Sequence, residues 1–336
     1  MAADILFIAL SLAVILLSCA LFTNAVEWFG KALGVSQGVV GSVFAAVGTA
    51  LPETIIPIIA ILVIGDEKSK EIGVGAIAGA PFMLATLAFF ITGLAVIAYA
   101  LTGRRGFKIN ADSRVISRDL SFFLVIYIVA VSTTFIRQYA LAKGVVAAAL
   151  FVSYFVYIRF TFSDQGGEGG EELKPLLLGR LFKTQENLVI IIIQLGLALA
   201  GIILGSRLFI ARVESLSEAL GVAPLIISII ITPIATELPE KFNSIIWMGE
   251  KKDTLALGNI TGAMVFQSCI PVAFGVAFTE WNLAGVTMVS AVLAIVSAGL
   301  VFLWVKLKAA VNPFALLLGG VFYAALLFYI FGGGNT

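Results

Sequence analysis

The chain is dominated by a succession of apolar runs of about 20 residues or more, separated by short charged or turn-forming segments. An apolar run of about 20 residues forms a helix that is long enough to cross a lipid bilayer. Only 12% of the residues are charged, whereas about 25% is usual for a soluble domain whose surface faces water. A transmembrane β-barrel would show short segments of alternating polarity instead. The sequence therefore predicts an all-α membrane protein.

Ten apolar segments qualify as transmembrane helices. Their expected limits are 4–31, 36–64, 72–101, 118–136, 139–161, 187–211, 222–248, 255–279, 283–305 and 312–331. The first segment has no basic stretch before it and is longer than the core of a signal peptide, so we expect it to remain as a mature helix.

The basic residues are unevenly divided between the two sides that this helix count implies. One side carries six of the 21, namely Lys68, Lys70, Arg137, Lys143, Arg207 and Arg212, and the other side carries the rest, with Lys241 counted in the turn after the seventh helix. Cytoplasmic loops are enriched in Lys and Arg. We therefore expect a multi-pass protein of the cell membrane with both termini outside.

The two halves of the chain contain matching segments. Residues 26–53 align without gaps to 213–240, with ten of 28 positions identical, and both segments end in T-x-L-P-E. Because each half has five expected helices, an odd number, the second copy must enter the membrane from the opposite side. The sequence predicts two inverted repeats, 1–162 and 186–336, joined by a solvated cytoplasmic linker, 163–185. Inverted repeats around a midplane site are a recurring architecture of secondary transporters.

Prolines occur in the middle of the two helices that carry the repeated motif. Pro52 and Pro57 lie in the second helix, and Pro233 and Pro239 lie in the seventh. Proline removes a backbone donor and frees carbonyl oxygens, which inside a membrane need a protein or polar partner. We therefore expect both helices to be interrupted near their centres.

Two glutamates end the repeated motifs at these expected breaks. A carboxylate at the centre of a transmembrane helix costs about 2.5–3.5 kcal/mol on insertion scales, so Glu53 and Glu240 should share compensating partners. Two carboxylates related by a pseudo-two-fold axis can neutralise one divalent cation, and carboxylate and carbonyl oxygens suit a hard cation. Gln267, a carboxamide deep in the eighth helix, is a further candidate for this site.

The strings GTALPE and ATELPE, each followed by a glycine-rich next helix, resemble the α-repeats of the calcium/cation antiporter superfamily, which includes sodium/calcium and proton/calcium exchangers. The resemblance implies that Glu53 and Glu240 are the central Ca²⁺ ligands. It further implies roles as flanking ligands for Thr49, Thr236 and Gln267, and as backbone carbonyl contributors for Ala46 and Pro233.

Several positions depart from what the resemblance implies for sodium exchangers. Where those proteins usually carry oxygen ligands for sodium, this chain has Ala50, Ala80, Leu84 and Ala263, and Glu237 replaces a serine. Protons need only carboxylates, so these departures favour H⁺ as the counter-ion. The histidine-containing motif that is usual in proton/calcium exchangers is absent, however, so Na⁺ stays open. We expect Glu237 to affect proton coupling rather than to hold Ca²⁺ directly.

These features favour a secondary antiporter that exchanges transported Ca²⁺ for H⁺, with Na⁺/Ca²⁺ exchange as the alternative and a cation channel as a weaker rival. The sequence has no histidine and none of the usual hydrolase or nucleotide-binding motifs, so we do not expect an enzyme. The basic residues form no stripe that would indicate nucleic-acid binding. The expected partners are membrane lipids and small inorganic cations.

Overall fold

The computed structural model describes residues 2–32, 50–164, 175–182 and 187–332. Within these ranges the chain is helical, and the only β-type contact is an isolated antiparallel bridge between Ile109 and Val311. Eight of the described helices are long and apolar enough to cross a membrane, and two shorter apolar helical stretches cover Leu51–Ile64 and Pro224–Glu237. The predicted class, an all-helical membrane protein, is confirmed.

The first half of the chain contains helices of very different length. They are α1 (Ala2–Ala32), α4 (Leu51–Ile58), α5 (Glu67–Met83), α6 (Phe89–Leu101), α7 (Ser113–Ser132), α8 (Ala140–Asp164) and the short α9 (Leu177–Phe182). Two π-helical segments extend this set. Ile59–Ile64 continues α4, and Leu84–Ala88 joins α5 to α6.

The second half contains five long helices. They are α10 (Leu188–Leu220), α11 (Pro224–Gly249), α12 (Asp253–Phe278), α13 (Val286–Lys308) and α14 (Pro313–Phe331). Helix starts in both halves carry the residues that favour them. The side chains of Asp66, Asn187 and Asn312 accept backbone N–H groups at the starts of α5, α10 and α14. The hydrogen bond from the Ser69 backbone holds the pKa of Asp66 below its ordinary value.

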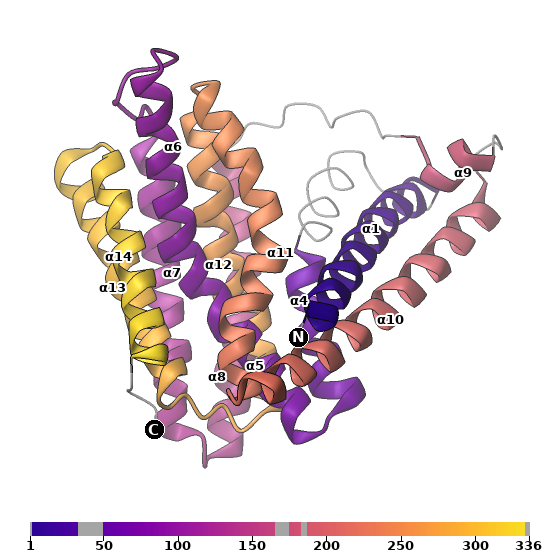
Figure 1. Cartoon of the computed structure of the whole chain (residues 1–336). Helices are drawn as coiled ribbons and strands as arrows, with labels where there is room; N and C mark the ends of the chain where they lie inside the picture. Colours follow the sequence, from indigo (N-terminus) through magenta and orange to yellow (C-terminus); the bar gives the residue numbers. More distant parts are fainter. Residues whose placement is uncertain (1, 33–49, 165–174, 183–186, 333–336) are drawn as a thin grey trace.

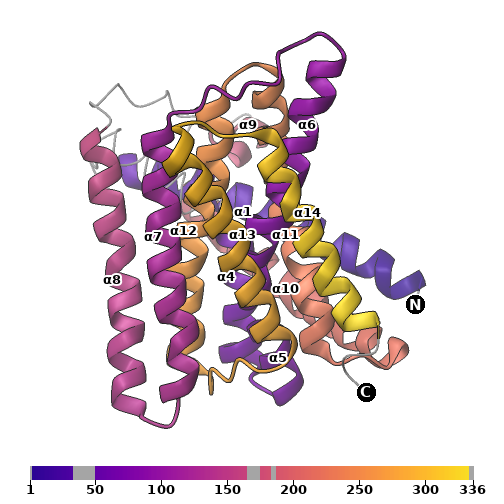
Figure 2. The ribbon, with the colours of Figure 1, turned by 90° about the vertical axis from the view of Figure 1, so that its left-hand side faces the viewer.

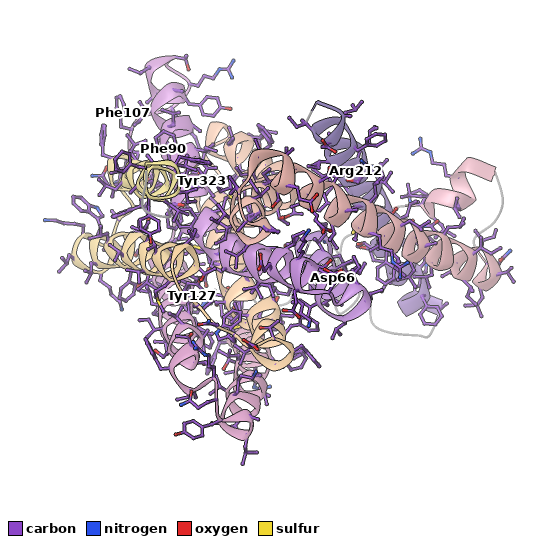
Figure 3. All side chains as sticks on the ribbon, turned by 60° about the horizontal axis from the view of Figure 1, so that its bottom comes forward. Asp66, Phe90, Phe107, Tyr127, Arg212 and Tyr323 are labelled. Carbon is purple, nitrogen blue, oxygen red and sulfur yellow. The ribbon has the colours of Figure 1, made fainter. Side chains whose placement is uncertain are left out.

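The helices form two groups in space. Helix α1 packs along α10, and this pair leans away from the others in Figure 1. In the larger group α5 packs against α11, α12 lies against α7 and α8, and α14 lies against α6 and α13, as Figure 2 shows from the side. From below (Figure 3), Arg212 lies on α10 and Asp66 at the turn before α5, whereas Tyr127 and Tyr323 lie in the larger group. Of two apolar cores, one lies inside the larger group, and the other joins the α1–α10 pair to α4, α5 and α11.

The predicted interruption of the seventh helix is wrong. Helix α11 is helical from Pro224 to Gly249, through both Pro233 and Pro239. A proline removes one donor and kinks a helix, but a helix packed against its neighbours can continue past it. In the second helix, α4 contains Pro57 and changes to a π-helix at Ile59. The half of that helix before Ala50 lies outside the described residues.

Parts of the expected linker, residues 163–185, are helical where the structure describes them. Helix α8 continues to Asp164, and residues 177–182 form α9. The amide of Asn24 accepts the backbone N–H of Leu177 at 2.9 Å, and buried Gln194 accepts that of Leu178 at 2.9 Å. Helix α9 is therefore held against the α1–α10 pair by two buried side-chain amides.

Candidate functional site

The described part of the site is centred on Glu237 of α11. Its side chain is completely buried, and its Oε1 accepts a hydrogen bond of 2.7 Å from Nε2 of Gln267 on α12. These two residues, both predicted as site residues, are therefore in direct contact. Gln267 is itself fully buried, and its Oε1 has no hydrogen-bond partner within the described structure. That oxygen is an acceptor of the kind that hard cations take as a ligand.

Lys241 lies at the same place, one helical turn after Glu237. Its Nζ is 3.5 Å from Oε2 of Glu237 and 3.5 Å from the backbone carbonyl oxygen of Asn259, and its side chain is 2% exposed. The assignment of Lys241 to a cytoplasmic turn was therefore wrong, because this side chain is buried within α11, which ends only at Gly249. The signal that could have revealed it is the helical spacing of a Glu and a Lys four residues apart.

Thr236 and Pro233 lie on the same helix as Glu237. Both are buried, and Thr236 Oγ1 donates a hydrogen bond of 3.0 Å to the carbonyl oxygen of Thr232. This bond uses the hydroxyl proton and leaves the oxygen lone pairs available as an acceptor. The carbonyl of Thr232 is the acceptor in that bond, so the polar groups of this turn are oriented by the helix itself.

Glu53 lies in the first turn of α4, directly after Pro52. Its side chain is buried, and α4 contacts both α11 and α12. The first turn of a helix favours a negative charge because its backbone N–H groups point toward it. Glu53 therefore lies on a helix that touches both helices of the Glu237–Gln267 contact.

Three residues of the predicted site lie wholly or partly outside the described structure. Thr49 and Ala46 lie outside the described residues, and of Glu240 only the helical backbone is described. That backbone follows Glu237 by three residues on α11, which is less than one turn. Among the side chains that the structure does describe, no three or more acidic or cysteine groups converge on one point.

Close backbone contact between α5 and α11 defines one wall of this region. A Cβ added at Gly79 would lie 2.3 Å from the carbonyl oxygen of Ile229, and one at Gly75 would lie 2.5 Å from that of Leu225. On α12, an added Cβ at Gly258 would meet none of the described residues within 4 Å, and one at Gly262 would lie 3.7 Å from the Tyr157 hydroxyl.

A second buried polar cluster joins α7, α8 and α12, and sequence reasoning missed it. Asp119 accepts hydrogen bonds from the Thr261 hydroxyl at 2.8 Å and from the Tyr157 hydroxyl at 3.0 Å. A guanidinium nitrogen of Arg118 lies 3.2 Å from Oδ1 of Asp119. The available signal was a carboxylate near the start of an apolar run. The cluster fixes α12 against its neighbours six residues before Gln267, so it positions the helix that carries the amide.

An apolar cavity of about 420 Å³ lies beside the site between α4, α8 and α12. Thr54, which follows Glu53, lines it together with apolar side chains such as Phe151 and Phe274. Thr54 Oγ1 donates its hydrogen bond to the Ala50 carbonyl oxygen at 2.6 Å. Apart from the Thr54 hydroxyl, the described side chains that line this cavity are hydrocarbon and offer no cation ligands.

A family-wide sequence model described as "Sodium/calcium exchanger protein" matches residues 4–162 and 190–332. The inner membrane protein YrbG of Escherichia coli K12 is 25% identical over 240 residues, which cover 71% of this chain and 69% of that protein. An uncharacterised membrane protein of Methanocaldococcus jannaschii is 25% identical over 285 residues, covering 85% of this chain and 84% of the relative.

Two solved structures share the fold. The H⁺/Ca²⁺ exchanger CAX superposes with a TM-score of 0.68 at 14% identity, covering 97% of this chain and 82% of that chain. The sodium-calcium exchanger NCX_Mj, soaked with Na⁺ and Sr²⁺, superposes with a TM-score of 0.55 at 18% identity, covering 97% of this chain and 98% of that chain. At these identities the likeness establishes the fold only.

Proposed function

Because this chain belongs to the sodium/calcium exchanger protein family, we propose that it is a secondary antiporter that exchanges Ca²⁺ for H⁺ across the membrane. The transport step is alternating access to one central site between two inverted five-helix halves, residues 1–162 and 186–336. In this proposal the ten predicted helices all span the membrane, with both termini on the outer side.

The observation that carries the proposal is a buried carboxylate and a buried amide oxygen on two packed transmembrane helices. Glu237 and Gln267 are both fully buried and joined by a hydrogen bond of 2.7 Å, while Oε1 of Gln267 has no hydrogen-bond donor among the described residues. Glu53 is buried on α4, which contacts both helices. With Glu240 on α11, this set offers carboxylate and amide oxygens, the ligand chemistry that Ca²⁺ prefers.

The composition of the α5 wall favours protons as the counter-ion. Where α5 approaches α11 it presents Gly75 and Gly79, with Ala76 and Ala80 buried beside them. These residues have no side-chain oxygen, so α5 supplies no neutral ligands for a set of Na⁺ ions there. Protons need only the carboxylates themselves.

The charge of the empty site explains why transport should be an exchange. Carrying ionised carboxylates through a low-dielectric membrane is costly. Ca²⁺ neutralises the pair Glu53 and Glu240, and so do two protons. The site therefore switches between the two sides of the membrane when it holds either Ca²⁺ or two protons, and it rarely switches when it is empty. Na⁺/Ca²⁺ exchange is the second candidate, supported by the fold shared with NCX_Mj.

Ca²⁺ uptake into proteoliposomes tests the proposal. We expect uptake driven by an imposed pH gradient at equal Na⁺ on both sides, accompanied by proton release into the opposite compartment. Glu53→Gln and Glu240→Gln should abolish this uptake. An amide is nearly isosteric with the acid, but it carries no negative charge for Ca²⁺ or a proton to neutralise. The exposed Glu71→Gln is the matched control and should transport normally.

Three outcomes would contradict the proposal. Uptake driven by a Na⁺ gradient at fixed pH, without proton flux, would select the second candidate. Ca²⁺ flux that needs no counter-ion would indicate a channel. Normal uptake by Glu240→Gln would remove the central carboxylate from the mechanism.

A further inference from the structure

A lysine ammonium is buried inside the region proposed to bind cations. Nζ of Lys241 lies 3.5 Å from Oε2 of Glu237, and the two side chains are 2% and 0% exposed. The other oxygen of the same carboxylate accepts from Gln267. Glu237 is therefore contacted by an ammonium on one side and by an amide on the other.

This pair differs from the other buried ion pair of the described structure. Arg105 and Asp253 form two hydrogen bonds, 2.7 and 2.9 Å long, and the guanidinium also donates to the Met248 carbonyl oxygen at 2.6 Å. That geometry is a tight bidentate contact at the start of α12. The distance of 3.5 Å between Lys241 Nζ and Glu237 Oε2 is longer than either of these hydrogen bonds.

Stability alone does not account for such a pair in this place. A buried ion pair adds little over well-packed apolar residues of similar size, although removing one partner is strongly destabilising. The pair lies beside Gln267, and Lys241 follows Glu240 directly in the sequence. What it changes at this location is the net charge that a transported cation meets.

We propose that the Lys241 ammonium is a tethered cation that permanently neutralises Glu237 and keeps free monovalent cations away from that carboxylate. Three carboxylates, Glu53, Glu237 and Glu240, together with one ammonium then carry a net charge of −2. One divalent cation or two protons balance this charge. This last step rests on the proposed function and makes the exchange electroneutral, whereas the neutralisation of Glu237 stands independently of it.

Thermal stability of the purified protein in detergent tests the tethered charge. In Lys241→Met the buried Glu237 has lost its ammonium and must take a cation from solution. The buffer is alkaline, so that protons are scarce. The Tm of Lys241→Met should rise with NaCl but not with choline chloride. When the Na⁺ concentration is near 100 times its dissociation constant, this rise should exceed that of the wild type by about 5 °C.

Two matched variants make the result specific. Glu237→Gln/Lys241→Met removes both charges and should lose the added Na⁺ dependence. Lys143→Met removes a lysine whose Nζ donates to a backbone carbonyl oxygen, that of Thr279, at 2.6 Å. It should keep the Na⁺ response of the wild type.

The inference is overturned if Lys241→Met responds to Na⁺ no more than the wild type, or if the double variant keeps the added response. Should Lys241→Met fail to fold in any salt, folding of the double variant supports the inference, because it shows that the unneutralised Glu237 is the cause. Failure of both variants overturns it, since the pair would then be a packing requirement. Stability is measured without transport, so a Na⁺ response in protein that does not exchange Ca²⁺ would reject only the proposed function.

Discussion

At the scale of single residues, the Arg105–Asp253 pair holds a connecting segment onto the helix bundle. Both side chains are 2% exposed, and the backbone N–H of Asn110 also donates to Asp253, at 2.7 Å. The backbone N–H of Asp112 donates to Thr254 at 2.8 Å. The segment between α6 and α7 is thus attached to the start of α12 by a buried charge and by backbone hydrogen bonds.

We predict that Arg105→Met destabilises the protein by about 3–5 kcal/mol, because it leaves a buried carboxylate without its cation. The exposed neighbour Arg104 provides the control, and Arg104→Met should stay within about 0.5 kcal/mol of the wild type. Denaturant titration in detergent measures both. Equal midpoints for the two variants would show that the pair contributes nothing beyond what its neighbours supply.

The sequence singled out Glu237 inside the repeated motif and Gln267 as a carboxamide within an apolar helix. The structure brings these two side chains into contact, while their roles in transport stay predictions. Lys241 and Asp119 were missed because charge near an expected helix end was taken as a sign of exposure. Whether such a side chain is buried depends on the partner that the fold supplies, and that partner is distant in sequence for Asp119, namely Thr261.

At the scale of elements, the approach of α5 to α11 depends on the absence of side chains. An added Cβ at Gly79 would lie 2.3 Å from the Ile229 carbonyl oxygen and 2.8 Å from Cγ of Pro233. The nearest obstacle is helix backbone, which cannot rotate away as a flexible side chain can. Close helix approach through small residues is a general device of membrane proteins.

We predict that Gly79→Ala separates the two helices, costs about 1–3 kcal/mol as an overpacked contact does, and impairs exchange because α11 carries Glu237 and Glu240. Gly299→Ala is the matched control on α13, where an added Cβ meets none of the described residues within 4 Å. It should be neutral or stabilising by up to about 1 kcal/mol, since alanine is the better helix former. Thermal denaturation in detergent and Ca²⁺ uptake measure the two effects, and a Gly79→Ala variant as stable and active as Gly299→Ala would contradict the packing argument.

Helix positions followed from apolar runs, whereas the irregularities inside helices did not. The segment expected at 72–101 is helical from Glu67 to Leu101, but it contains a π-helical stretch at Leu84–Ala88 shortly after Pro81. Proline removes a donor and disturbs the hydrogen-bond ladder. Whether the chain then breaks, kinks or changes to a π-helix is decided by packing, which explains why α11 continues where an interruption was expected.

At the scale of the whole molecule, the turns between helices lie on two opposite sides. In Figure 1 the turns 102–112 and 250–252 lie in the upper part, whereas 137–139 and 279–285 lie at the lower edge. The upper turns carry Arg104, Lys108 and Lys251, so the side richer in basic residues forms one end of the molecule. The enrichment of basic residues in cytoplasmic loops predicts that this end faces the cytoplasm.

Labelling of single cysteines from outside the cell tests this orientation. Gln138 is exposed in the lower turn, and Gly106 is exposed in the upper turn with open space around its Cα. In intact cells a membrane-impermeant maleimide should label Gln138→Cys, while Gly106→Cys should react only after permeabilisation. The native thiols Cys19 and Cys269 are both buried, so the unmodified chain is the control and should give little background. The reverse labelling pattern would place the basic end outside and reverse the predicted topology, with both termini in the cytoplasm. Exchange could still occur in that orientation, because the ion gradients set the direction of Ca²⁺ movement across the membrane, and Ca²⁺ would then enter the protein from its other end.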